Sequence, residues 1–455
     1  MEQQAGGRSL TEGPVLPGLV GFAVPMFLSL LLQTLYGTVD VLVIGNFGST
    51  AGVSAVATGS QVLMLATYLI AGFTTAATVL IGQYLGARDE KNVAQVIGGS
   101  IPVFVCMSVF FAAVMVLLHP AILTALNVPA EAMPQARLYT LICSCGIPLI
   151  VGYNAVCAVL RGMGDSKSPL MFVLVACCVN IAGDLLLTGA LQMGAAGVAI
   201  ATVTAQGVSF LISLVFLAKR GIGVPFSRAN IRFDGKLTRK LFQLGVPLAV
   251  QSIMINLSFL LITAIINAMG VTASAAMGVG DKITGFAFLP QSAFSQAVQV
   301  FTAQNVGAGK PGRASRSMWY AAGITAVWGV CFVLLCNTAP TLLPGLFSSD
   351  AAVVEMTGLY VRAYSFDVLL TCAVFCMNGF LAGCGCAGFS MVTNLLGAFA
   401  VRIPVTYVLS RVAGVTLFMI GLAAPAASVV QIVVTLAYLR TGRWKQKLIA
   451  ADTRE

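Results

Sequence analysis

Two acidic residues within apolar stretches of the sequence are candidates for ion chemistry. Asp40 follows Tyr36 by four residues, and Asp184 follows Asn180 by four. Residues four apart share one face of a helix, so each pair presents a carboxylate beside a neutral polar group. If the two faces converge, their oxygen atoms form a hard ligand set of the kind that suits Na⁺. Two neighbouring carboxylates can also share a proton.

Asn154 and Thr202 add polar groups to two further apolar stretches. For these two residues both interpretations stay open: they are ion ligands, or they hydrogen-bond one helix to another. The acids are different, because a charge at the centre of a bilayer costs at least about 2.5–3.5 kcal/mol and marks a functional site by default. Asp40 and Asp184 are therefore the stronger candidates.

The second half of the chain carries its own buried polar residues. They are Asp281, Lys282, Asp367, Arg402, Tyr364 three residues before Asp367, and the uncharged Gln251. We expect a second polar site among Asp367, Tyr364, Gln251 and Asp281. Over the whole chain, four intramembrane acids outnumber two bases, and an acidic interior suits cationic cargo together with protons or Na⁺.

Composition fixes the class of protein in which these residues lie. Of 455 residues, 58% are apolar and only 9% are charged. A soluble protein with so few charges would not cover its surface, and a disordered one needs the opposite balance. The chain is a polytopic membrane protein. With His119 its only histidine, we expect no zinc or haem cofactor, and the net charge of +10 sits in membrane-flanking gaps rather than in a nucleic-acid-binding patch.

Apolar stretches long enough to span a bilayer repeat along the whole chain, each needing about 20 residues. We place twelve, at 17–44, 52–83, 95–118, 134–160, 168–190, 194–218, 238–268, 273–305, 316–340, 352–382, 388–411 and 414–440. Pro25 and Pro247 predict bends in the first and seventh.

Lys and Arg residues predict the orientation of these stretches. Twenty of the 25 basic residues lie in the two tails and in alternate gaps, whereas the gaps around 45–51, 119–133, 191–193, 269–272 and 341–351 contain none. Cytoplasmic loops carry the basic excess. We therefore expect a multi-pass protein of the inner (plasma) membrane with both termini in the cytoplasm.

The chain also repeats itself at an offset of 221 or 222 residues. QYLGARD at 83–89 matches QNVGAGK at 304–310, LRGMG at 160–164 matches LAGCG at 381–385, and Pro25 matches Pro247. Two six-helix halves of one orientation are related by an axis along the membrane normal, which is transporter architecture. We predict an all-α fold with two pseudo-two-fold-related six-helix bundles: 1–218, a cytoplasmic linker at 219–240, and 241–455 with a basic cytoplasmic tail.

Over essentially its full length the sequence resembles the MATE (multidrug and toxic compound extrusion) family. The segments that carry the resemblance are LLQTLYGTVDVLVIGNFGSTAGVSAVATG, QYLGARD, LRGMGDSKSPLMFVLVACCVNIAGDLLL, GAAGVAIATVTAQ and AFLPQSAFSQAVQVFTAQNVGAGKPGRA. The family implies two six-helix bundles that export mostly organic cations in exchange for H⁺ or Na⁺.

The resemblance also implies roles for single residues. The family's first-bundle cation site falls on Asp40, Asn180, Asp184 and Thr202, where Na⁺ is one expected ligand, with Tyr36 and Asn154 in the adjoining hydrogen-bond network. A further asparagine of some archaeal members matches Cys157 here. The NorM-like branch uses a glutamate on its seventh helix, and the seventh stretch here contains no acid. This favours a DinF-like branch with coupling in the first bundle.

We therefore expect a multidrug antiporter without enzymatic activity or cofactor, driven by H⁺ or Na⁺. Its expected partners are small organic cations and membrane lipid, with no nucleic acid, and the protein is expected to be monomeric. A membrane-embedded enzyme lacks a nucleophile beside its acids, and the repeat favours alternating access over a channel. The closer alternative is a flippase for a lipid-linked precursor, which would prefer a cationic cavity.

Overall fold

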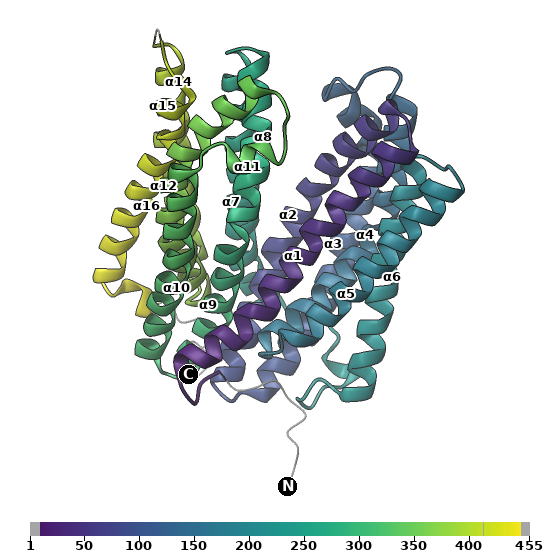
Figure 1. Ribbon diagram of the computed structural model, residues 1–455. Coiled ribbons are helices and arrows are strands. Elements are labelled where there is room, and N and C mark those ends of the chain that lie inside the picture. Colours follow the sequence, from purple (N-terminus) through teal and green to yellow (C-terminus); the bar gives the residue numbers. More distant parts are fainter. Residues whose placement is uncertain (1–9, 413, 447–455) are drawn as a thin grey trace. The chain divides into compact units, whose positions relative to one another are not determined.

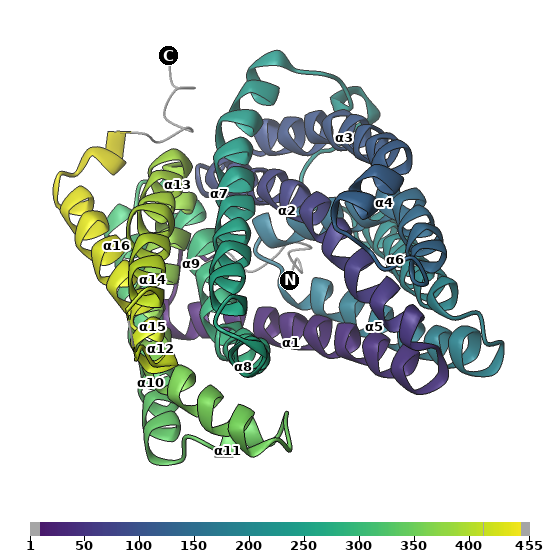
Figure 2. The same cartoon turned by 90° about the horizontal axis from the view of Figure 1, so that it is seen from above.

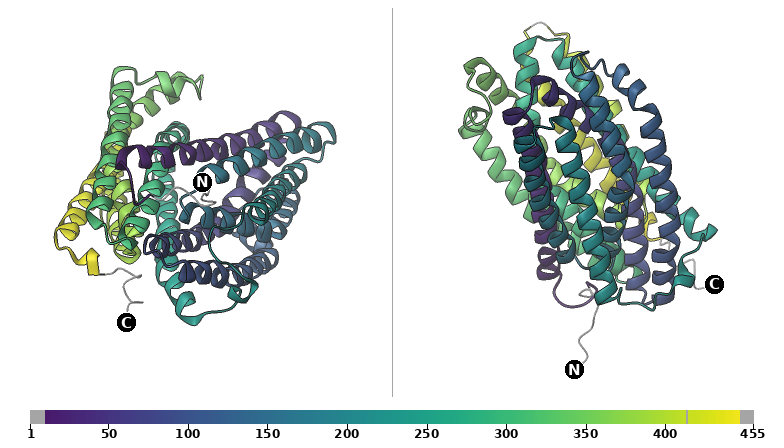
Figure 3. Two further views of the ribbon diagram at one scale, coloured as in Figure 1. Left: turned by 90° about the horizontal axis from the view of Figure 1, so that it is seen from below. Right: turned by 90° about the vertical axis from the view of Figure 1, so that its right-hand side faces the viewer.

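The structure is a computed structural model that describes residues 10–412 and 414–446. Helices and their connections make up this part of the chain, and it contains no β-strand (Figures 1 and 3). Three basic residues of the tails counted above, Arg8, Lys447 and Arg454, lie outside the described residues. The all-α class predicted from the sequence is confirmed.

The first half of the chain contains six long helices. In chain order its elements are α1 (Val15–Phe47), α2 (Thr50–Gly86), α3 (Glu90–Ala125), α4 (Met133–Gly162), α5 (Lys167–Asp184), the π-helix η1 (Leu185–Ala190), α6 (Ala195–Arg220) and the short 3-10 helix η2 (Arg228–Asn230). Side-chain caps begin two of them: the Ser49 hydroxyl accepts a hydrogen bond from the Gly52 N–H, and the Asp89 carboxylate accepts one from the Asn92 N–H.

The second half repeats this order with more interruptions. Its elements are α7 (Gly235–Asn267), α8 (Val271–Ala287), α9 (Leu289–Gly307), α10 (Pro311–Thr338), α11 (Leu342–Gly345), α12 (Ala351–Gly383), α13 (Ala387–Leu395), the π-helix η3 (Leu396–Arg402), α14 (Ile403–Ser410), α15 (Leu417–Gly421), α16 (Ala423–Arg440) and η4 (Arg443–Gln446).

Each of the twelve predicted stretches is helical in the structure. Eleven elements of the described chain are long and apolar enough to cross a membrane. The remaining stretch, the eighth, consists of α8 followed by α9, which meet at Phe288. Pro290 lies in the first turn of α9, where a proline begins a helix well but cannot continue one. The chain is a multi-pass membrane protein.

Contacts divide the chain into two compact units whose boundaries lie inside α1 and α7. Residues 24–249 form the first unit, and residues 10–23 join the chain from 250 onward in the second. Pro25 and Pro247 lie beside these two boundaries. The division expected at 219–240 follows chain order, whereas the contacts assign the first parts of α1 and α7 to the other half's unit.

One central helix organises each unit. In the first unit, α4 packs against α2, α3 and α6, and α5 packs against α6 (Figure 2). In the second unit, α12 packs against α8, α9, α10, α15 and α16. The second unit also holds residues 10–13 by their backbone: Asn305 donates to the Leu10 carbonyl at 3.1 Å, and Arg313 donates to the Gly13 carbonyl at 2.6 Å.

The repeated motifs form the same turn in both units. After α2 and α9, the chain turns through Arg88 (φ 60°) and Gly309 (φ 71°), which occupy matching positions of the repeat. After α4 and α12, the turns pass through Gly164 (φ 85°) and Gly385 (φ 80°). A residue in the left-handed region ends a helix and satisfies its last carbonyls. The motifs therefore repeat because each ends a helix in the same way.

This geometry predicts opposite effects for two glycine-to-alanine substitutions. Gly309→Ala adds a Cβ in a left-handed conformation with no atom crowding it, so the backbone strain alone should destabilise the protein by about 1–2 kcal/mol. Gly323→Ala lies within α10 with equally open surroundings and should stabilise the protein by about 0.5–1 kcal/mol. Thermal unfolding of both purified variants measures this. A destabilising Gly323→Ala would contradict the reasoning.

Candidate functional site: a buried carboxylate pair

Asp40 of α1 and Asp184 at the end of α5 lie side by side in the first unit. The Asp40 residue is 9% exposed and Asp184 is fully buried. Their carboxyl groups lie within hydrogen-bonding reach of each other, and the Asn180 side chain also reaches Asp40. The structure thus brings together the two acids that the sequence placed on separate helices.

Several oxygen atoms of this cluster have no hydrogen-bond donor among the described residues. They are Oδ1 of Asp40, Oδ1 of Asn180 and both carboxylate oxygens of Asp184. At about 4 Å and an effective dielectric constant of about 20, two ionised carboxylates repel by about 4 kcal/mol. A buried polar atom without a partner carries a further cost. A proton or a small hard cation between the acids removes both penalties, and the ligand set fits such an ion.

Close packing of α5 against α6 completes this ligand set. Gly183 has no side chain, and a Cβ at its position would meet the Cβ of Ala201 at 2.9 Å. The two helices can therefore approach beside Asp184, and the Asn180 amide donates to the Thr202 hydroxyl oxygen at 3.5 Å. Thr202 in turn donates to the Val198 carbonyl at 3.0 Å, which fixes its oxygen in place.

A cavity of about 270 Å³ opens beside the acid pair. Four of the predicted residues line it, namely Tyr36, Asp40, Asn154 and Thr202. Asn180 and Asp184 are buried next to Asp40. The Asn154 amide donates to the Ile150 carbonyl of its own helix at 2.8 Å, so one of its groups is already satisfied within α4.

The cavity contains polar residues that the sequence analysis did not select. Its lining includes Gln33, Ser60, Thr67, Tyr139, Tyr153 and Gln206. The hydroxyl groups of Tyr139 and Ser60 are hydrogen-bonded at 2.9 Å, and Gln206 hydrogen-bonds Tyr36. Helical spacing could have predicted two of them. Gln206 lies four residues after Thr202, and Gln33 lies three residues before Tyr36.

A π-helix begins immediately after Asp184. The element η1 spans Leu185–Ala190, directly continuing α5. π-Helical turns are rare and occur frequently at functional sites. The wider turn changes the direction of the side chains that follow the acid, and its position supports Asp184 as part of a functional cluster.

The polar residues of the second unit form a different arrangement, built around Arg402. The Arg402 guanidinium donates to the Tyr364 hydroxyl at 3.0 Å and lies over the Phe259 ring at 4.2 Å from its centroid. It also interacts electrostatically with Asp281 and Asp367. Asp367 accepts a further hydrogen bond from Ser428 at 2.5 Å. The acids of this unit therefore already face a positive charge.

The repeat places Arg402 at or next to the position that Asn180 holds in the first unit. Arg402 follows Asn180 by 222 residues, and the repeated motifs are 221 or 222 residues apart. A guanidinium is protonated at every physiological pH. The second unit thus has a side chain of fixed positive charge where the first unit has a neutral amide beside two acids.

Gln251, the remaining residue of the predicted second-bundle site, belongs to a separate network. The Ser390 hydroxyl is hydrogen-bonded to the side-chain oxygen of Gln251 at 3.1 Å and to the side-chain oxygen of Asn378 at 2.9 Å. The Asn394 amide donates to Asn378 at 3.1 Å. The structure therefore brings Asp367, Tyr364 and Asp281 together around Arg402 and places Gln251 with neutral residues.

The comparisons with known proteins give the family. The sequence model of the MatE family matches residues 25–186 and 247–408, one match in each half of the chain and each beginning at the proline of its first helix. These matches cover most of the sequence. The chain belongs to the MatE family of membrane transporters, as its motifs predicted.

Individual relatives match over nearly the full length. The chain is 28% identical to the probable multidrug resistance protein YpnP of Bacillus subtilis over 435 residues, which cover 96% of this chain and 97% of the relative. It is 22% identical to the multidrug export protein MepA of Staphylococcus saprophyticus, with 89% of each chain covered. A solved MOP superfamily transporter from Pyrococcus furiosus has the same fold, with a TM-score of 0.91, 19% identity, and coverage of 98% and 99%.

The contact between α5 and α6 predicts a sharp difference between two further glycine substitutions. Gly183→Ala should destabilise the protein by about 1–3 kcal/mol, because the new methyl group meets another Cβ on a packed helix. Gly207→Ala on α6 should cost less, since its new methyl group meets only the flexible end of Leu149 at 3.2 Å. Thermal unfolding of the two variants tests the difference. Equal losses would show that α5 and α6 are less closely packed beside Asp184.

Proposed function

We propose that this protein exports small organic compounds, mostly cations, by cation-coupled antiport with alternating access. The observation that carries the proposal is the buried pair Asp40 and Asp184. Three of its four carboxylate oxygens have no hydrogen-bond donor among the described residues, and Asp40 lines the cavity of about 270 Å³. Intramembrane acids of this kind mark ion or substrate pathways in transporters. Relatives that carry the names multidrug resistance protein and multidrug export protein support the choice of cargo class.

The coupling ion in this proposal is H⁺ or Na⁺, held by the first unit. Asp40 and Asp184 supply the charge, and Asn180 and Thr202 supply neutral oxygens on the same side. Among the described residues no group of three or more His, Cys, Asp and Glu side chains is placed to hold a metal ion. Two carboxylates with neutral oxygens suit an ion that is bound weakly and exchanged in every cycle.

The cavity supports a cationic cargo. Tyr36, Tyr139 and Tyr153 line it together with Asp40. Aromatic faces attract cations, and the attraction grows when the site excludes water. A lipophilic cation would thus compete with the coupling ion for the same negative charge, and this competition drives exchange: binding of one favours release of the other.

Arg402 supports coupling in the first unit rather than the second. Its guanidinium interacts electrostatically with Asp281 and Asp367 and carries a positive charge at every physiological pH, so a mobile cation gains less beside those two acids. The contacts of Arg402 also count against the alternative function, a flippase for a lipid-linked precursor. Such cargo carries pyrophosphate and needs free positive charge, whereas Arg402 is engaged by Tyr364 and two acids.

We further propose that the protein lies in the inner (plasma) membrane with both termini in the cytoplasm. The 20-to-none distribution of basic residues between alternate gaps supports this orientation. In this topology the 219–240 linker is cytoplasmic, and the 341–351 connection faces the opposite side.

Substitution of either acid should abolish coupling. Asp40→Asn and Asp184→Asn keep side-chain shape but remove the exchangeable charge, so gradient-driven export should fall to background while folding and membrane insertion persist. The matched control is Asp350→Asn, since Asp350 caps α12 and asparagine caps equally well. Efflux of a fluorescent lipophilic cation from proteoliposomes, with pH and Na⁺ gradients imposed separately, measures this. Wild-type transport by both acid variants would refute the coupling proposal.

The orientation predicts which sites a membrane-impermeant thiol reagent reaches. Ala229→Cys, in the exposed part of the linker, should be labelled only in permeabilised cells. Ser349→Cys, exposed in the opposite gap, should be labelled in intact cells in which the reagent has access to the plasma membrane. The unsubstituted protein, with its twelve free cysteines, gives the background. The reverse pattern would overturn the orientation.

A further inference from the structure

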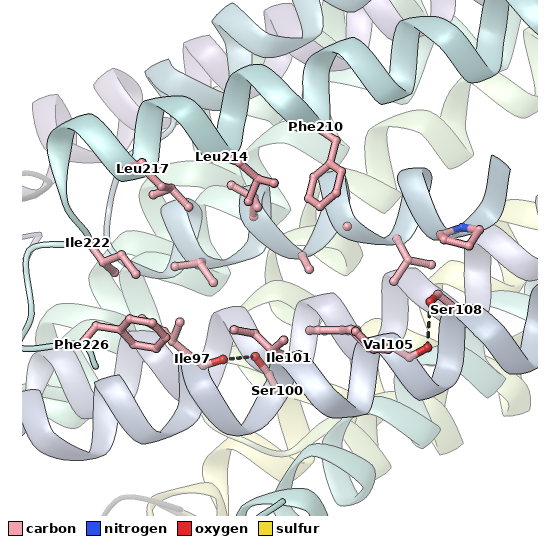
Figure 4. A pocket seen from close by; sticks show the side chains of 18 of the residues that line it. Ile97, Ser100, Ile101, Val105, Ser108, Phe210, Leu214, Leu217, Ile222 and Phe226 are labelled. Carbon is pink, nitrogen blue, oxygen red and sulfur yellow. Dashed lines mark hydrogen bonds between the residues drawn. The ribbon is translucent and has the colours of Figure 1, made fainter. Parts of the chain in front are cut away.

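The first unit contains a second and larger cavity, separate from the acid pair. It is a groove of about 760 Å³ with α3 on one side, α6 on the other and α4 between them (Figure 4). Ile97, Ile101 and Val105 line it from α3, and Phe210, Leu214 and Leu217 line it from α6 (Figure 4). Its volume lies within the range of about 300–1,000 Å³ that is usual for ligand sites.

The groove offers a ligand only apolar contacts. All its lining residues are apolar apart from two serines, Ser100 and Ser108. Both serine hydroxyls donate to carbonyls of their own helix, at 2.8 Å in each case, so neither needs a ligand (Figure 4). A charged cargo would find no counter-charge in this lining. The chemistry fits a hydrocarbon chain.

Parts of the groove lining are exposed at the protein surface. Val105 is 55% exposed and Leu214 is 42% exposed, and both lie in helices that are long and apolar enough to span a bilayer. Large apolar side chains that remain exposed on spanning helices contact lipid. A lipid can therefore enter sideways without crossing a polar barrier.

The linker after α6 closes one end of the groove. Ile222 and Phe226 lie together at this end (Figure 4), and the turn that follows is held by hydrogen bonds between Ser227 and Asn230. Asn230 packs on Gly98 of α3, where any side chain would collide with the linker backbone. The linker therefore packs on α3, and its basic residues lie at the end of an apolar groove.

Basic residues of the linker flank its contact with α3. Arg228 and Arg232 lie on either side of Asn230, whose backbone packs on Gly98, and both basic residues are exposed. The nearby acid Asp165 is already paired with Arg220 at 2.9 Å. Basic residues beside an intramembrane cavity recognise anionic lipid headgroups.

We propose that this groove binds an anionic phospholipid, with an acyl chain between α3 and α6 and its phosphate beside Arg228 and Arg232. The apolar lining, its exposure at the protein surface and the basic linker select one molecule that combines hydrocarbon with negative charge. The site is separate from Asp40 and Asp184, so the inference does not depend on the proposed antiport. It needs only the position of the linker at the membrane surface.

Native mass spectrometry of the full-length purified protein tests the proposal, with phosphatidylglycerol and phosphatidylcholine of equal chain length as probes. The wild type should retain phosphatidylglycerol preferentially.

Leu214→Trp fills the groove and should reduce binding of both lipids, whereas Leu211→Trp, on an exposed α6 position outside the lining, should not. The double substitution Arg228→Gln and Arg232→Gln should lower phosphatidylglycerol affinity by roughly tenfold and leave phosphatidylcholine unchanged. Lys236→Gln with Arg239→Gln, two exposed residues at the start of α7, is the matched charge control.

Three outcomes would overturn the proposal. Equal retention of the two lipids by the wild type would show that the site does not recognise the lipid headgroup. Equal effects of Leu214→Trp and Leu211→Trp would show that lipid binds the general surface rather than the groove. Displacement of a photoreactive lipophilic cation, but of no lipid, by Leu214→Trp would assign the groove to cargo instead.

Discussion

The structure depends on one electrostatic constraint: two carboxylates lie beside each other within apolar helices, and no basic residue of the described chain is paired with them. Asp40 and Asp184 face oxygen atoms, and four oxygens of their cluster have no donor. In a low-dielectric interior this arrangement is stable only when a proton or cation lies between them. The close contact at Gly183, the hydrogen-bonded Thr202 hydroxyl and the π-helix after Asp184 all lie beside this pair.

The second unit shows how the same repeated scaffold satisfies this constraint differently. Arg402, at or next to the position equivalent to Asn180, interacts electrostatically with Asp281 and Asp367 and carries a positive charge at every physiological pH. A cation that belongs to the chain cannot be exchanged. The two halves share their turns at Arg88 and Gly309 yet differ in the polar residues around Asn180 and Arg402.

Much of this could be predicted from the sequence. Charge in an apolar stretch identified Asp40 and Asp184, and helical spacing placed Tyr36 and Asn180 beside them, because these are properties of single helices. Contacts between residues of separate helices could not be predicted from the sequence. The partnership of Arg402 with Tyr364 joins residues from separate elements, and the attachment of residues 10–13 to Asn305 and Arg313 spans almost 300 positions. The break at Phe288 was missed since the apolar pattern continues unbroken through it.

The central claim is that cargo and coupling ion exchange at Asp40 and Asp184. The most direct measurement is the release of ions when a lipophilic monocation is added to purified protein in weakly buffered solution, followed by a pH electrode and, after loading with ²²Na⁺, by equilibrium dialysis. The account predicts that cargo binding releases H⁺ or Na⁺ from the wild type and releases neither from Asp40→Asn or Asp184→Asn. Cargo that binds the wild type without releasing either ion would contradict it.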